Sequence, residues 1–300
     1  MKDGITTRLC LGLFLAALSL PARAQDGGVT TPAGNEPEAA SADAIAKELA
    51  NPAGSLASLK NNFEYRLYEG DLPDARDQDG WTYSFQPVLP FPVGDQGRRI
   101  IFRPLIPVKL DEPSGFDPLA RDFETDGPEL GDLSFDLVYA GNETGGPSKG
   151  WLWGVGAAGT LPTGTGDFGG DQWRLGPELF GGITGEWGIV GGLVSHQWEV
   201  GGSNDANYSA TAFNYFYAFG LGNGWQLASS PIITHDWKAD GGEAWAVPIG
   251  VGLAKTTVLG STPLKVQFEV QKYLVQPDSF GPDWLFKLTI TPVIENPFLF

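Results

Sequence analysis

The sequence predicts an all-β protein: an antiparallel up-and-down transmembrane β-barrel of about 12 strands with a short N-terminal helix. Three observations predict it: a secretory leader, about a dozen segments with alternating apolar and polar residues, and tryptophans at the ends of those segments. The predicted division is a signal peptide over 1–24, a flexible linker and short periplasmic or plug helix over 25–58, and an outer-membrane barrel over 59–300.

The first 24 residues have the features of a secretory signal peptide. Lys2 and Arg8 are positively charged, Leu9–Leu20 is apolar, and Ala22–Ala24 is a small-x-small cleavage site. A membrane anchor is the alternative, but a helix that crosses a bilayer needs about 20 apolar residues. The only cysteine, Cys10, lies in this leader, so the mature chain is expected to hold no disulfide.

The charge of the chain excludes one class of partner. The formal net charge is −17, and removal of the leader makes it more negative. A protein that binds nucleic acid through its phosphate backbone needs a basic surface, so no nucleic-acid partner is expected.

The segment between leader and barrel has two parts. Gln25–Ala40 is rich in Gly, Pro, Thr and Ala and is expected to be a flexible linker. Ser41–Asn51 is predicted to be helical, because Ser41 can cap its start and Pro52 ends it. The sequence leaves open whether this helix lies inside the lumen or in the periplasm.

From Leu59 onward the hydrophobic period changes from helical to two. Most of the predicted strands are about ten residues long, as tilted strands that cross a bilayer need to be, whereas strands of soluble proteins average about five or six. The predicted strands lie near 59–67, 81–92, 98–108, 129–139, 151–161, 173–183, 187–199, 208–219, 225–237, 245–255, 263–273 and 284–294.

The last predicted strand shows the alternation clearly. Trp284, Phe286 and Leu288 fall on one face, whereas Lys287 and Thr289 fall on the other. A soluble sandwich would turn the apolar face inward, and a membrane barrel would turn it toward lipid. Strand length and tryptophan placement favour the second arrangement.

The tryptophans are expected to form girdles at the two membrane interfaces. Indole favours the headgroup level, where its ring is half buried and its N–H stays hydrated. The predicted girdle residues are Trp81, Trp151, Trp153, Trp173, Trp187, Trp198, Trp225, Trp237, Trp245 and Trp284.

Several short motifs resemble one family of outer-membrane proteins. The chain resembles the phenol meta-cleavage (MetA-pathway) degradation family of transporter proteins over most of its mature length. The resemblance implies an outer-membrane β-barrel in a Gram-negative cell, with a role in the uptake of aromatic compounds. The residues that carry it are Asn51-Pro52, Leu59, Asn61–Phe63, Gly150–Gly156, Leu161–Thr163, Trp173–Pro177, Trp245–Pro248 and Gly281–Trp284.

The inward faces of the predicted strands carry charged side chains. Arg99 and Arg103 are predicted to form ion pairs with Asp132 and Asp136 on the next strand. This set is either a permeation path with a slightly positive wall or a network that fills and stiffens a narrow lumen. The predicted pore-lining residues are Lys60, Glu64, Arg66, Arg99, Arg103, Asp132, Asp136, Arg174, Glu178, Lys265, Glu269 and Lys287.

No catalytic or metal site is predicted. Ser195 and His196 are adjacent in sequence, so a strand points them to opposite faces, and the same holds for His235 and Asp236. Asp77–Gly80 resembles part of a calcium loop but lacks the later glutamate. The chain is therefore expected not to be an enzyme and to hold no cofactor or metal.

The sequence favours a passive outer-membrane channel or transporter for small molecules, with aromatic or apolar compounds as the candidate solutes. The alternative is a closed structural or surface-binding barrel that works through its acidic outer loops. The expected partners are outer-membrane lipid and an unknown small solute; the oligomeric state stays open.

Overall fold

A computed structural model describes residues 41–94, 96–144, 149–203 and 207–296 of the chain. The predicted signal peptide and linker lie outside the described residues. The elements are α1 (Ala42–Ala50), β1 (Ala57–Glu69), η1 (Ala75–Asp77), β2 (Asp79–Val93), β3 (Arg98–Asp117), β4 (Asp122–Asp126), β5 (Glu129–Leu130), β6 (Leu133–Thr144), β7 (Lys149–Leu161), η2 (Gly166–Phe168), β8 (Gln172–Gly185), β9 (Gly188–Gly202), β10 (Ser209–Gly222), β11 (Trp225–Ser229), β12 (Ile232–Asp236), η3 (Gly241–Glu243), β13 (Trp245–Leu259), β14 (Thr262–Val275) and β15 (Gly281–Ile294).

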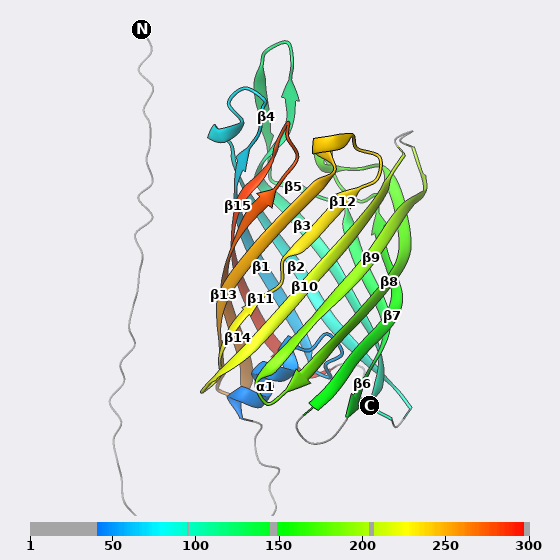
Figure 1. Ribbon diagram of the computed structural model, residues 1–300, viewed down its shortest axis with the longest axis vertical. Helices are drawn as coiled ribbons and strands as arrows, with labels where there is room; N and C mark the ends of the chain where they lie inside the picture. Colours follow the sequence, from blue (N-terminus) through cyan, green and yellow to red (C-terminus); the bar gives the residue numbers. More distant parts are fainter. Residues whose placement is uncertain (1–40, 95, 145–148, 204–206, 297–300) are drawn as a thin grey trace, which may run out of the picture. The chain divides into compact units, whose positions relative to one another are not determined.

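The described strands close into a barrel. The long strands pair antiparallel in the order in which they follow in sequence, and β1 pairs with β15 to close the ring. β11 and β12 together occupy one strand position, so the wall is a closed barrel of 12 strands (Figure 1). Each of the predicted segments contains strand, and the predicted fold class is confirmed. Within the described residues, no helix has the length and apolar character needed to cross a membrane.

Two segments differ from the sequence prediction. The predicted strand near 225–237 is interrupted between β11 and β12 at Ser230-Pro231, because proline cannot donate to the ladder. The predicted outer loop Lys109–Pro128 is instead partly strand: β3 continues to Asp117 and forms a hairpin with β4. This hairpin rises above the rest of the barrel at the end opposite α1 (Figure 1).

The two faces of the wall differ in polarity. Phe268 is 52 % exposed on the outside, whereas its neighbour Glu269 is 1 % exposed on the inside. Leu179 and Glu178 on β8 repeat the pattern, at 52 % and 1 %. A soluble β-sandwich turns its apolar side chains inward, so this wall has the reverse geometry.

The predicted helix is present and lies at one end of the barrel. Its N-cap is Ser41, whose Oγ accepts a hydrogen bond from the Ala44 N–H at 3.2 Å, and it ends at Ala50 before Asn51-Pro52. Asp43 accepts a hydrogen bond from the Gly224 N–H at 2.5 Å, in the turn between β10 and β11. Figure 1 shows α1 across the end of the barrel where the turns are short.

The segment after α1 packs inside the barrel. Ala53 is fully buried in a cluster with inward-facing apolar residues of seven strands. The Arg99 guanidinium donates to the Ala53 carbonyl at 2.9 Å and fixes the segment to β3. We name residues 41–56 the plug. The other buried members of the cluster are Ile101, Val138, Ala140, Leu152, Phe180, Ile189, Ala218 and Ala228.

The contact between β8 and β9 gives a stability prediction. A Cβ at Gly176 would lie 1.6 Å from the His196 carbonyl oxygen, whereas a Cβ at Gly181 would meet no atom closer than 3.9 Å. Gly176→Ala should therefore destabilise the barrel by about 1–3 kcal/mol, because the strands must move apart. Gly181→Ala is the matched control and should change stability far less. Urea unfolding of both variants in detergent micelles measures the difference, and equal midpoints would contradict the predicted clash.

Candidate functional site: the barrel lumen

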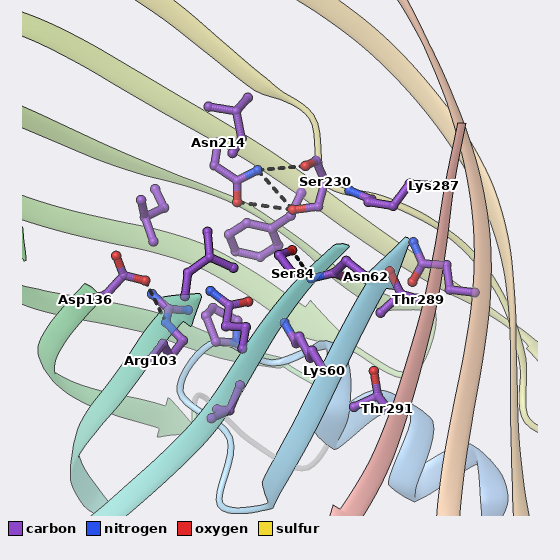
Figure 2. A pocket seen from close by; sticks show the side chains of 18 of the residues that line it. Lys60, Asn62, Ser84, Arg103, Asp136, Asn214, Ser230, Lys287, Thr289 and Thr291 are labelled. Carbon is purple, nitrogen blue, oxygen red and sulfur yellow. Dashed lines mark hydrogen bonds and ion pairs between the residues drawn. The ribbon is translucent and has the colours of Figure 1, made fainter. Parts of the chain in front are cut away.

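A cavity of about 560 Å³ lies inside the barrel above the plug. Its wall is formed by inward-facing side chains of β1, β2, β3, β14 and β15 and of the opposite strands, and Glu48–Pro52 form part of its floor. Figure 2 shows polar side chains from several strands pointing into this space. The volume falls within the range of small-molecule binding sites.

The inward-facing residues of β1, β15 and β14 form rows across the wall. Lys265 faces Thr291, Gln267 faces Thr289, and Glu269 faces Lys287. β1 continues these rows, since Asn62 pairs with Thr289 and Glu64 pairs with Lys287. The Thr289 hydroxyl donates to Asn62 Oδ1 at 2.9 Å, and Asn62 Nδ2 donates to Ser84 Oγ at 3.2 Å.

Glu269 is the most heavily bonded carboxylate of this wall. It accepts hydrogen bonds from the Ser229 hydroxyl at 2.6 Å, the Ser230 N–H at 3.1 Å and Gln271 Nε2 at 2.8 Å. Lys287 Nζ lies 3.1 Å from its other oxygen. These donors compensate the loss of hydration that burial imposes on a charge.

Arg103 holds two carboxylates on the opposite wall. Its Nε lies 3.0 Å from Asp136 and its Nη2 lies 3.3 Å from Glu178 (Figure 2 labels Arg103 and Asp136). Arg103 and Asp136 are also direct partners in the β3–β6 register. The predicted ion pair between these two residues is therefore present.

Three predicted pore-lining residues contact other groups and do not border this cavity. Arg99 binds the plug, as described, and has no carboxylate within 4.0 Å among the described residues. Asp132 accepts hydrogen bonds from the N–H groups of Gly164 and Gly170 at 2.9 and 3.0 Å. Arg174 lies over the Tyr208 ring at 4.0 Å. Of the predicted ion pairs between Arg99 or Arg103 and Asp132 or Asp136, only Arg103–Asp136 forms among the described residues, because Ala140 lies opposite Arg99 in the register.

The sequence prediction missed Glu112 as a residue of the inner wall. The carboxylate is buried, and it accepts hydrogen bonds from Arg66 at 3.0 Å and from Tyr68 and Thr82. Lys109 Nζ lies 3.7 Å away. The sequence prediction ended this strand near residue 108 and so placed Glu112 in an outer loop, whereas β3 continues to Asp117 past a register irregularity beside Trp81. Five further residues that were predicted to line the pore do line the cavity: Arg66, Glu178, Lys265, Glu269 and Lys287.

The ten tryptophans lie near the ends of strands, in two groups. Nine are exposed on the outer surface by more than a third of their area, and Trp153 is half-buried. Those at the long-loop end are Trp81, Trp173, Trp198, Trp237, Trp245 and Trp284, and those at the end where α1 lies are Trp151, Trp153, Trp187 and Trp225.

Both histidines lie among these tryptophans. The His196 ring packs at a tilt against Trp198, its Nδ1 lies 2.8 Å from the Thr211 hydroxyl, and its Nε2 lies 3.3 Å from Ser209 Oγ. Ser209 is buried, and neither hydroxyl beside His196 is a carboxylate that could orient the ring as a base. His235 packs against Trp237 and Trp245.

The wall between β10 and β13 is the least regular part of the ladder. β13 pairs with β11 only over Leu253–Lys255 and with β12 only over Trp245–Ala246. Side chains take over the hydrogen bonding here. Asn214 Nδ2 donates to the Ser230 and Pro231 carbonyls at 3.0 and 2.9 Å, whereas the Tyr215 and Tyr217 hydroxyls donate to the Pro248 and Gly250 carbonyls at 3.1 and 2.9 Å. Figure 2 shows Asn214 beside Ser230.

Comparison with known proteins shows the fold alone. The chain matches no protein-family model and no curated protein. An outer membrane channel from Pseudomonas putida F1 shares the fold, with a TM-score of 0.58 and 12% sequence identity, over 80% of this chain and 96% of that one. The OccAB3 structure from Acinetobacter baumannii gives a TM-score of 0.34 and 8% identity, over 79% of this chain and 98% of that one.

Proposed function

We propose that the chain is an outer-membrane channel for the passive passage of small molecules, with aromatic or apolar compounds among them. The observation that carries this proposal is the polarity of the wall. Apolar side chains face outward between two groups of tryptophans, and polar side chains surround an internal cavity of about 560 Å³. A barrel that crosses a membrane and encloses a hydrated path needs this arrangement.

Two further points support the proposal. The fold is shared with an outer membrane channel. The predicted signal peptide would direct the chain out of the cytoplasm. The resemblance of the chain to the phenol meta-cleavage family favours aromatic solutes. The residues we expect solutes to pass are those of the inner wall, Arg66, Arg103, Asp136, Glu178, Lys265, Glu269 and Lys287.

Single-channel recording of the refolded mature protein in a planar bilayer tests the proposal. At two salt concentrations, discrete conductance steps that scale with salt are expected. Uptake of small solutes by liposomes is the second readout. A shift in gel mobility on heating verifies that the barrel is folded. If folded, inserted protein shows neither conductance nor solute uptake, the chain is not a channel.

The plug favours one alternative, a closed structural or surface-binding barrel. Ala53 has no exposed surface and packs against apolar residues from several strands, so the lumen is filled at that level. This alternative predicts no permeation, and it predicts loss of partner binding when the hairpin within 109–128 is shortened. The bilayer recording separates the two functions.

A further inference from the structure

Two lysines of the cavity wall lack an ionic partner. Arg66, Arg103, Lys109 and Lys287 each lie within 4.0 Å of a carboxylate. Among the described residues, no carboxylate lies within that distance of Lys60 or Lys265, and no hydrogen bond joins either one to another residue. The cavity wall therefore holds two ammonium groups whose charge the protein does not neutralise by contact.

The two lysines lie in the same row of the wall. Lys265 on β14 faces Thr291 on β15. β1 and β15 pair with Ser58 opposite Val293 and Asn61 opposite Ile290, which puts Lys60 beside the same Thr291. Neighbouring strands are about 4.8 Å apart, so the two Cα atoms are separated by roughly 10 Å. Flexible four-carbon side chains can direct both ammonium groups at one ligand from this distance. Figure 2 shows Lys60 and Thr291 side by side near the floor of the cavity.

The surroundings do not stabilise these charges. Lys265 is 8 % exposed; the charge that acts most strongly on it is the repulsive one of Lys60, and the attraction of Glu269 is weaker. Lys60 is repelled by Arg103 and Lys287 and attracted only by Asp136. Asp136 is bound to Arg103, and Glu269 is bound to Lys287. A buried charge without a partner is costly, so a bound anion would stabilise this row.

The composition of the lining indicates the charge and shape of that anion. Six basic residues line the cavity, Lys60, Arg66, Arg103, Lys109, Lys265 and Lys287, against five acidic ones, Glu48, Glu64, Asp136, Glu178 and Glu269. Glu112, which pairs with Arg66 and Lys109, balances the sixth basic residue, so the uncompensated charge is local to Lys60 and Lys265. A monoanion that contacts both ammonium groups would supply the counter-charge that they lack. Apolar side chains share the cavity, among them Val88, Leu105, Leu193 and Phe216, and they can cover an apolar body.

We propose that Lys60, Lys265 and the Thr291 hydroxyl form a binding site for the carboxylate of a small molecule with an apolar body. This site names a substrate class for the proposed channel and rests on that function for its biological meaning. A cation pair and a hydroxyl match the acceptor oxygens of a carboxylate. The site lies directly above the plug, so the carboxylate would bind at the deepest point of the cavity.

Calorimetric titration of the folded mature protein in detergent tests this site. Benzoate is the probe, and benzyl alcohol has the same ring without the charge. We expect benzoate to bind at least about tenfold more tightly than benzyl alcohol, since charge-assisted hydrogen bonds are stronger than neutral ones. Lys60→Gln/Lys265→Gln should weaken benzoate binding by at least about tenfold and leave benzyl alcohol unchanged. Lys238→Gln, which removes the same charge from an exposed loop position, is the matched control and should bind benzoate like the wild type.

Each contrary outcome overturns the site. If benzoate binds no more tightly than benzyl alcohol, the lysines do not recognise a carboxylate. The same conclusion follows if benzoate binds the double variant as tightly as the wild type. Phenyl phosphate that binds more tightly than benzoate would assign the site to a phosphate ester and reject the carboxylate. If the double variant does not refold, Lys60→Gln alone carries the test, because Lys60 is less buried than Lys265. Titration in detergent requires no permeation, so its failure is distinguishable from a silent bilayer recording, which would reject the channel instead.

Discussion

Deletion of residues 25–56 should increase the single-channel conductance of the barrel several-fold. The plug fills the lumen at the end where the turns are short, and Ala53 is fully buried there against inward-facing residues such as Ile101 and Leu152. A barrel of 12 strands lies between small barrels that side chains fill and large porins that hold an aqueous channel. Removing the plug should therefore leave a continuous hydrated path. Conductance of the truncated and full mature chains in planar bilayers measures the effect.

A shorter deletion provides the control for this experiment. A chain without 25–40 retains α1 and the Arg99 contact to Ala53. The difference between the two truncated chains therefore isolates the plug. Equal conductance in both would show that the plug does not limit ion flow, and the constriction would then have to lie higher in the lumen.

Replacing Arg103 with methionine should destabilise the barrel by about 3–5 kcal/mol. Arg103 is the contact cation of Asp136 and Glu178, at 3.0 and 3.3 Å, and the Glu178 side chain is 1 % exposed. Its loss leaves two carboxylates on the inner wall with uncompensated charge. The free energy of unfolding in urea, in detergent micelles or lipid vesicles, measures the loss.

Two further variants show whether charge causes this effect. Arg98→Met removes an arginine whose ion pair with Glu143 is more exposed, so it should cost no more than about 1 kcal/mol. Arg103→Met/Glu178→Met also removes one of the two carboxylates left without a cation and should recover part of the stability. If Arg103→Met and Arg98→Met cost the same, the Arg103 cluster contributes no more than a surface ion pair.

The strands could be predicted from sequence because their pattern is local. Alternation such as that of Lys265, Gln267 and Glu269 against Val266 and Phe268 depends only on the two-residue period of a strand. Helix α1 was equally predictable, since Ser41 and Pro52 mark its ends within a few residues. The inward or outward direction of each face followed from strand length and tryptophan position.

The contacts inside the lumen could not be predicted in the same way. Which charges meet depends on the stagger between strands, and a bulge such as that near Trp81 shifts it. The sequence placed Lys60 and Lys265 on the inner wall but could not show that Glu269 would be bound to Lys287. The interruption at Ser230-Pro231 was also missed, because the alternation on either side of it looks continuous.

The pairing of β1 with β15 has a consequence for biosynthesis. Asn61 Nδ2 donates to the Ile290 carbonyl at 3.3 Å across 229 positions of sequence. The seam of the wall therefore cannot form until nearly the whole barrel sequence is available for pairing. Contacts this distant in sequence form slowly, and unpaired strand edges are prone to aggregate meanwhile. Until β15 is in place the edge of β1 stays unpaired, so β15 is the strand that completes assembly.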